Sequence, residues 1–156
     1  MKLSMTYSVK IKRLNHIFMD TVRLYRQAVS FFMDVCLQEW DTISSGKGQK
    51  ERVNLVESLT VASKKNPSVL YDFGADFYKF PSYLRRAAIA EALGKVSSYR
   101  SNLARWEAAD PASRGEKPGL PQAGIIYPAM YRENMFLRTG TYPVSYTHLT
   151  LPTKRI

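Results

Sequence analysis

Apolar and polar side chains alternate along the first residues of the chain. Five apolar residues fall on one side, namely Leu3, Met5, Tyr7, Val9 and Ile11. A side-chain period of two is typical of a half-buried β-strand. We therefore expect residues 1–14 to hold the first strand of a small β-unit.

After Asn15 the apolar period changes from two to 3.6. The new stripe consists of Val22, Tyr25, Val29, Phe32, Cys36, Trp40 and Ile43. This spacing predicts one amphipathic helix over residues 16–43. The polar run SSGKGQ, from Ser44 to Gln49, then predicts a loop, and a shorter helix is expected from Lys50 to about Ser63.

A second long stripe lies in the segment YKFPSYLRRAAIAEALGKVSSYRSNLARWE, from Tyr78 to Glu107. Ser82 follows Pro81 and provides an N-cap signal for a long helix. The apolar face of this helix comprises Ile89, Leu93, Val96, Tyr99, Leu103 and Trp106. The aromatic residues before it could stack on nucleic-acid bases or, more commonly, wedge helices together; these are Tyr71, Phe73, Phe77, Tyr78 and Phe80.

Proline and glycine dominate the segment that follows Trp106. Residues 111–122 therefore read as a linker, and short strands are expected at Ile125 to Tyr131 and Met135 to Arg138. These strands would pair with the N-terminal strand. The predicted fold class is α+β, with a mainly helical bundle over residues 15–110 inserted in a small, incomplete β-unit that resumes over residues 123–143.

The chain of 156 residues has a formal net charge of +10 and a pI near 9.8, which favours a polyanionic partner. Residues 1–26 carry +5, residues 27–78 carry −2 and residues 79–118 carry +4. No apolar run approaches the roughly 20 residues of a spanning helix, and no signal peptide opens the chain. We expect a cytoplasmic protein that binds nucleic acid and does not bind membranes.

Basic and aromatic residues of the two basic segments are the candidate contacts to nucleic acid. The cations are Lys10, Lys12, Arg13, Arg23, Arg26, Lys79, Arg85, Arg86, Lys95, Arg100 and Arg105, and the stacking candidates are Tyr83 and Tyr99. Arg85 and Arg100 would lie roughly 22 Å apart along a helix, which is enough to follow several phosphates. The ordinary alternative is that these arginines line the rim of a core.

No catalytic or metal-binding constellation is found in the sequence. The only histidines are His16 and His148, and Asp72 with Asp76 is more typical of a solvated pair. GKGQ lacks the full phosphate-binding pattern. The single Cys36 lies on an apolar helical face, so we expect a buried thiol.

The last thirteen residues, VSYTHLTLPTKRI, continue none of these patterns. From Val144 to Thr153 they resemble a conceptual translation of the transposon-end adapter used to prepare DNA sequencing libraries. We therefore expect residues 144–156 to be an artefactual tail and the natural protein to continue past Tyr142. Without the tail, which holds Lys154 and Arg155, the net charge is +8.

The remaining chain resembles the N-terminal half of TnpB-like (OrfB-type) proteins, transposon-encoded relatives of type V CRISPR effectors. The resemblance rests on YSVKIK, YRQAVSFF, the long helical segment, KPGLP and YPAMYRENMFLRTG. Many relatives carry a Pro-Thr turn after the first strand, whereas this chain has RLNH from Arg13 to His16. This departure suggests a divergent branch.

The resemblance implies a wedge (OB-like) β-domain interrupted by a helical recognition domain, which together bind guide RNA and its heteroduplex with target DNA. It places a RuvC-like nuclease with two metal ions, and a structural zinc ribbon, in a later part of the parent protein. This chain would then be a non-catalytic fragment without a cofactor. The alternatives are a DNA-binding helical module of a conventional transposase or regulator, and a protein-interaction scaffold or inert fragment. The oligomeric state is not predicted.

Overall fold

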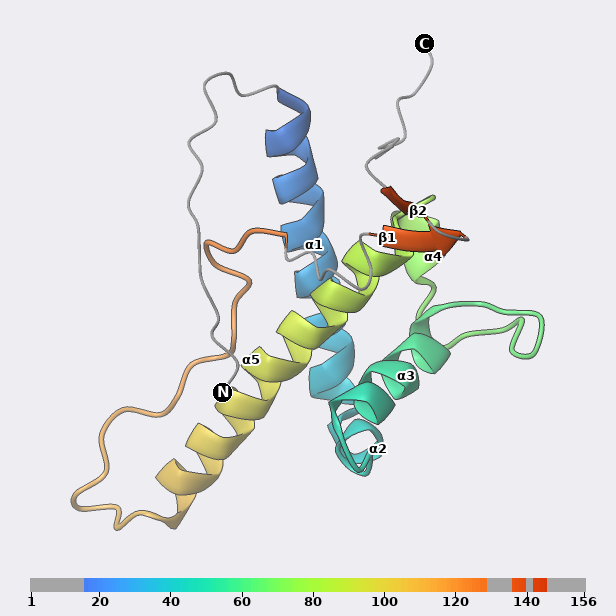
Figure 1. The fold of residues 1–156 in the computed structure, drawn as a ribbon. Coiled ribbons are helices and arrows are strands. Elements are labelled where there is room, and N and C mark those ends of the chain that lie inside the picture. The colour runs from blue at the N-terminus through green and yellow to red at the C-terminus, as the bar shows by residue number, and fades with distance from the viewer. Residues whose placement is uncertain (1–15, 129–135, 140–141, 146–156) are drawn as a thin grey trace, which may run out of the picture.

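A computed structural model describes residues 16–128, 136–139 and 142–145 (Figure 1). Its helices are α1 (His16–Gln38), α2 (Trp40–Ser44), α3 (Gln49–Thr60), α4 (Phe73–Asp76) and α5 (Ser82–Ala108). Its strands are β1 (Phe136–Thr139) and β2 (Tyr142–Ser145). The two long helices, α1 and α5, cross each other, and α2 and α3 lie to one side of the crossing.

The core lies where α1 crosses α5. The buried residues of α1 include Tyr25, Val29, Phe32 and Cys36, as the stripe predicts. Ala28 on α1 and Ala88 and Ala92 on α5 are fully buried, and such small side chains allow two helices to approach closely. Within α5 the last buried residue is Val96, so the C-terminal half of this helix projects beyond the core (Figure 1).

The single helix predicted over residues 16–43 is bent at Glu39, where α1 ends and α2 begins. Backbone hydrogen bonds from Glu39 to Val35 and from Ile43 to Glu39 continue through the bend. The hydroxyl of Tyr71 lies 3.0 Å from Oε1 of Glu39 and anchors the bend from a distant segment. An apolar period cannot reveal such a contact, because the period is the same on both sides of the bend.

Five phenylalanines form an aromatic cluster that joins α1 to the segment before α5. Phe73 stacks on Phe32 and Phe77, with centroid separations of 4.7 and 4.5 Å, and meets Phe31 and Phe80 edge to face. The core role predicted for Phe73, Phe77 and Phe80 is therefore confirmed. The same prediction is wrong for Tyr78, which is 74% exposed. Asp72 accepts hydrogen bonds from the backbone amides of residues 74 and 75, so it caps α4.

Residues 109–128, which we call the strap, return from the end of α5 to α1 without helix or strand (Figure 1). At its beginning, Trp106 donates an indole hydrogen bond of 2.7 Å to the carbonyl of Gly115. At its end, the Nε of Arg26 donates to the carbonyl of Ile126 at 2.9 Å, and the guanidinium lies over the Tyr127 ring. Side-chain hydrogen bonds therefore attach the strap at both ends.

The predicted α+β fold class is wrong, because residues 16–128 contain five helices and no strand. The predicted strand at Ile125 has no ladder in its described part: Gly124 adopts a φ of +64°, and the Ile126 carbonyl bonds to Arg26. The described strands, β1 and β2, form an antiparallel hairpin with each other. The strand predicted within residues 1–14 lies outside the described residues.

Cys36 is fully buried, as predicted, and burial raises the pKa of its thiol to about 12 from an ordinary value of 9.0. The folded state thus keeps a proton that the unfolded chain releases, so stability falls as pH rises from 9 towards 12. We expect the stability difference between the wild type and Cys36→Ala to shrink over this range in urea titrations. A difference that stays constant with pH would contradict the assignment. Burial also raises the pKa of Tyr83, but this contribution is common to both proteins and cancels.

Candidate nucleic-acid interface

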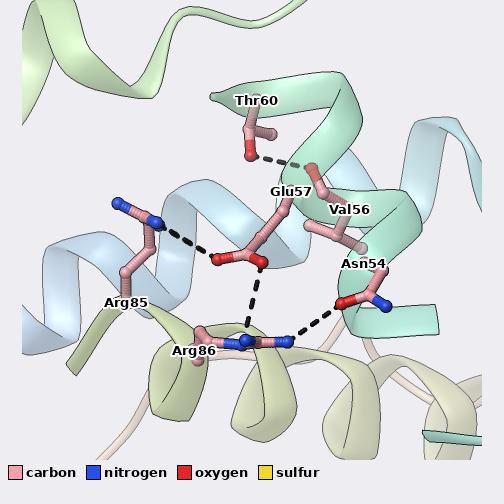
Figure 2. A network of polar contacts seen from close by, with 6 residues as sticks. All are labelled: Asn54, Val56, Glu57, Thr60, Arg85 and Arg86. Carbon is pink, nitrogen blue, oxygen red and sulfur yellow. Dashed lines mark hydrogen bonds and ion pairs between the residues drawn. The ribbon is translucent and has the colours of Figure 1, made fainter. Parts of the chain in front are cut away.

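Two of the arginines predicted to contact phosphates instead join α5 to α3 (Figure 2). Nη2 of Arg85 lies 3.2 Å from Oε1 of Glu57, and Nε of Arg86 lies 3.7 Å from Oε2 of the same carboxylate. Arg86 also donates to Oδ1 of Asn54 at 2.9 Å. The Arg85 side chain is 20% exposed and that of Arg86 44%, so Arg86 alone keeps substantial access to solvent.

Replacing Glu57 with glutamine should destabilise the fold, because one carboxylate balances two guanidinium groups. These ion pairs are partly buried, so we expect the free energy of unfolding to fall by about 1–2 kcal/mol, between the values for exposed and buried pairs. Urea unfolding at pH 7 measures this change. Glu107→Gln is the matched control, since Glu107 is exposed, and it should change stability by less than about 0.5 kcal/mol. Equal effects of the two substitutions would contradict the structural role of Glu57.

Arg100 connects α5 to the C-terminal end of α1. Its Nη2 donates to the carbonyl of Leu37 at 3.1 Å, and its Nε is buried without a partner. A cation at the C-terminal end of a helix is favourable for the helix dipole. Arg85 and Arg100 therefore direct donors towards α3 and α1, which favours the alternative that they line the rim of the core.

The residues predicted at the start of α5 differ in accessibility. Lys79 is exposed, has a φ of 56°, and places Nζ 5.1 Å from the centroid of the Tyr78 ring. Tyr83 is half-buried and packs against the core. Lys79 is accessible to an anion, whereas the packing of Tyr83 leaves less of its ring for stacking.

The outer face of the N-terminal half of α1 carries two predicted cations beside exposed apolar side chains. Arg23 forms a 2.7 Å ion pair with Asp20, and its side chain is 70% exposed. Arg26 lies beside it and holds the end of the strap. Both border a cavity of about 480 Å³ that is also lined by Met19 and Val22. We call this region the α1 outer face.

A second hollow lies between α5 and the strap. This α5 groove has a volume of about 510 Å³, and its lining includes Lys95 and Tyr99 together with Asn102 and Gln122. Arg105 is exposed further along α5. Sequence reasoning missed Asn102 and Gln122, since a periodic pattern does not mark isolated amides and the return of the strap brings Gln122 to α5.

Most of the positive charge lies outside the helical body. Residues 16–128 hold fifteen basic and twelve acidic residues, a net of +3 out of the total of +10. Without the expected tail at residues 144–156, the total is +8, and the other +5 is divided between residues 1–15, with +4, and residues 129–143, with +1. The predicted contacts Lys10, Lys12 and Arg13 belong to the first segment, outside the described residues. We call residues 1–15 and 129–143 the basic flanks.

Both basic flanks connect, in sequence, to described residues near the α1 outer face. The first ends at residue 15, directly before α1, and the second begins at residue 129, directly after the part of the strap that Arg26 holds. His16 and Arg26 are ten residues apart, which is about 15 Å along a helix. The two attachment points thus lie near opposite ends of the stretch of α1 that carries Arg23 and Arg26.

In the part of the chain that the structure describes, no three His, Cys, Asp or Glu residues lie together as a metal site would require. Among the same residues, no helix has both the length and the apolar character needed to cross a membrane.

Comparison with known proteins places the chain in a family. The model of the Aq_aa04 family matches residues 5–148. The chain belongs to the Aq_aa04 family. It is similar to "Uncharacterized protein aq_aa04" from Aquifex aeolicus (strain VF5), with 30% identity over 121 residues that cover 70% of this chain and 68% of the relative. No solved structure matches the chain.

The match to the Aq_aa04 family extends across the helical body and into both basic flanks. Lys10, Lys12 and Arg13 fall within it, as do the strap and both long helices. The basic residues before α1 therefore lie within the region that the family model matches, and we treat them together with the α1 outer face as one candidate interface.

Proposed function

We propose that this chain binds nucleic acid as the N-terminal part of a transposon-encoded, RNA-guided DNA endonuclease. Its ligands would be the guide RNA and the heteroduplex that this RNA forms with target DNA. The observation that carries the proposal is the position of the charge. Without the expected tail, +5 of the net +8 belongs to the basic flanks, which join the helical body at the start of α1 and at the end of the strap that Arg26 holds. The resemblance to TnpB-like proteins supplies the identity of the nucleic acid.

The proposed phosphate contacts differ from those predicted from the sequence, which were made largely by arginines along α5. Lys10, Lys12 and Arg13 would neutralise phosphates together with Arg23 and Arg26 of the α1 outer face. Such contacts carry little base information, so the shape of an A-form helix would determine the preference. The core arginines of α5 would support this surface by holding α1 and α3 in place.

A salt titration with matched ligands tests the proposal. We expect the chain to bind an RNA hairpin more tightly than a DNA hairpin of the same sequence, with an affinity that falls steeply as salt rises. Each phosphate contact contributes roughly 0.7–0.9 to the slope of log affinity against log salt. A preference for DNA would favour the conventional DNA-binding module. Absence of binding to either ligand would contradict the proposal and leave the protein-interaction scaffold.

The nuclease part of the proposal has a separate test. If the proposal is correct, the source DNA read past the codon for Tyr142 should encode separated acidic residues of a two-metal nuclease and paired CxxC motifs. A frame without these features would remove the RNA-guided nuclease from the proposal, while the hairpin titration would still decide whether the chain binds nucleic acid.

A further inference from the structure

The α5 groove presents a set of side chains suited to a flat, polar ring. Tyr99 supplies an aromatic surface, and Asn102 and Gln122 supply amide groups from its α5 side and its strap side. Its volume of about 510 Å³ falls within the range of small-molecule sites. The groove is open at Gly94, where an added Cβ would meet no atom within 4 Å.

The charge of the groove favours a neutral group over a phosphate. Lys95 lies 3.8 Å from Glu91, and both side chains line the groove, so their charges compensate each other. A dianionic phosphate in this position would be repelled by Glu91. A nucleobase is uncharged and has donors and acceptors at its edge, which amide side chains can match.

We propose that the α5 groove holds one unpaired adenine of a bound RNA. This inference rests on the proposed function, because it adds a base-reading site to the phosphate-binding surface. Tyr99 would stack on the base, and Asn102 or Gln122 would pair with the N6 amino group and N7, the edge that amides recognise in adenine. Lys95 would contact the adjacent backbone. RNA-binding proteins commonly read unstacked bases from loops and bulges in this way.

Binding of two RNA hairpins, alike except for one bulged adenine, tests the groove. We expect the wild-type chain to prefer the bulged hairpin by about tenfold, within the range for stacking of one base on an aromatic ring. A bulged uracil should give a smaller preference, because its edge lacks the adenine pattern. An equal affinity for paired and bulged hairpins would overturn the inference.

Gly94→Gln provides the sharpest variant, because Gly94 lines the groove and an added Cβ there would meet no atom within 4 Å, so a longer side chain can begin in open space. It also replaces glycine inside a helix, so the fold should be as stable or more stable. We expect it to abolish the preference for the bulged adenine. Tyr99→Leu should do the same and Tyr99→Phe should retain the preference, whereas Tyr78→Leu is the control for an exposed tyrosine outside the groove.

The outcomes separate this inference from the proposed function. Steep salt dependence with no effect of Gly94→Gln or Tyr99→Leu on the bulge preference would leave phosphate binding intact and refute the groove. Failure to bind any hairpin would refute the proposed function and, with it, the groove. Equal losses in Tyr99→Leu and Tyr78→Leu would show that surface tyrosines act without a defined site, which also overturns the inference.

Discussion

Replacement of Lys10, Lys12, Arg13 and Arg23 together by glutamine is expected to weaken RNA-hairpin binding by about a thousandfold at 0.1 M salt. Four lost phosphate contacts correspond to a decrease of roughly 3–4 in the slope of log affinity against log salt. Arg23 is highly exposed, and its removal leaves Asp20 in solvent, so its contribution to the fold is small. Fluorescence anisotropy across a salt series measures both quantities.

The matched control removes four charges from a different part of the surface. Lys47, Lys50, Lys64 and Lys65 are exposed, and they lie near the two ends of α3. In Figure 1 this region is well separated from the N-terminal half of α1. Their replacement by glutamine should leave the slope within about one of the wild type. Equal effects of the two quadruple variants would mean that net charge alone attracts RNA, and the proposed interface would be wrong.

Phe73→Ala should cause the largest loss of stability among single substitutions in the aromatic cluster. Phe73 is 3% exposed and contacts four other phenylalanine rings, so its removal leaves a cavity where α1 meets the segment before α5. The expected decrease in the free energy of unfolding is about 3–5 kcal/mol, a large part of the stability of a domain of this size.

Urea unfolding monitored by circular dichroism measures this loss. Tyr78→Ala is a suitable control because Tyr78 is 74% exposed, and a change of less than about 0.5 kcal/mol is expected. A Phe73 variant as stable as the control would show that the aromatic cluster does not hold α1 against the segment before α5. It would also reopen the possibility that these rings serve as a base-stacking surface.

Local periodicity predicted the helices well where a neighbour packs along the whole apolar stripe. Tyr25, Val29 and Phe32 of α1 are buried as the 3.6 period indicates. The stripe of α5 was only partly predictive, because the buried residues of this helix end at Val96, and Tyr99 and Leu103 are half-exposed. A sequence pattern shows which face of a helix is apolar but not how far along it a partner extends.

Polar contacts between distant segments could not be predicted from the sequence. Glu57 binds Arg85 across 28 positions, and the Leu37 carbonyl meets Arg100 across 63. Nothing in the local pattern distinguishes an arginine that faces solvent from one that bonds to another helix. The same limit explains the mistaken fold class, because strand assignments depend on pairing partners and the Ile126 carbonyl bonds to an arginine side chain.

The candidate site was also predictable from the sequence only in part. The overall charge and its concentration near the N-terminus were evident from the sequence, and Lys95 and Tyr99 were candidates, although Tyr99 was also assigned to the apolar packing face. The groove that contains both residues depends on the return of the strap along α5. A chain without a packed strap would have the same composition and no groove, so only the structure could show that Gln122 and Asn102 line the same groove.

Cross-linking of a 4-thiouridine-labelled RNA hairpin to the wild-type chain, with the adducts mapped by mass spectrometry, tests the central claim most directly. We predict adducts within residues 2–26 and close to the end of the strap, around Tyr127. Adducts concentrated on α2 and α3, with none before residue 27, would contradict the account.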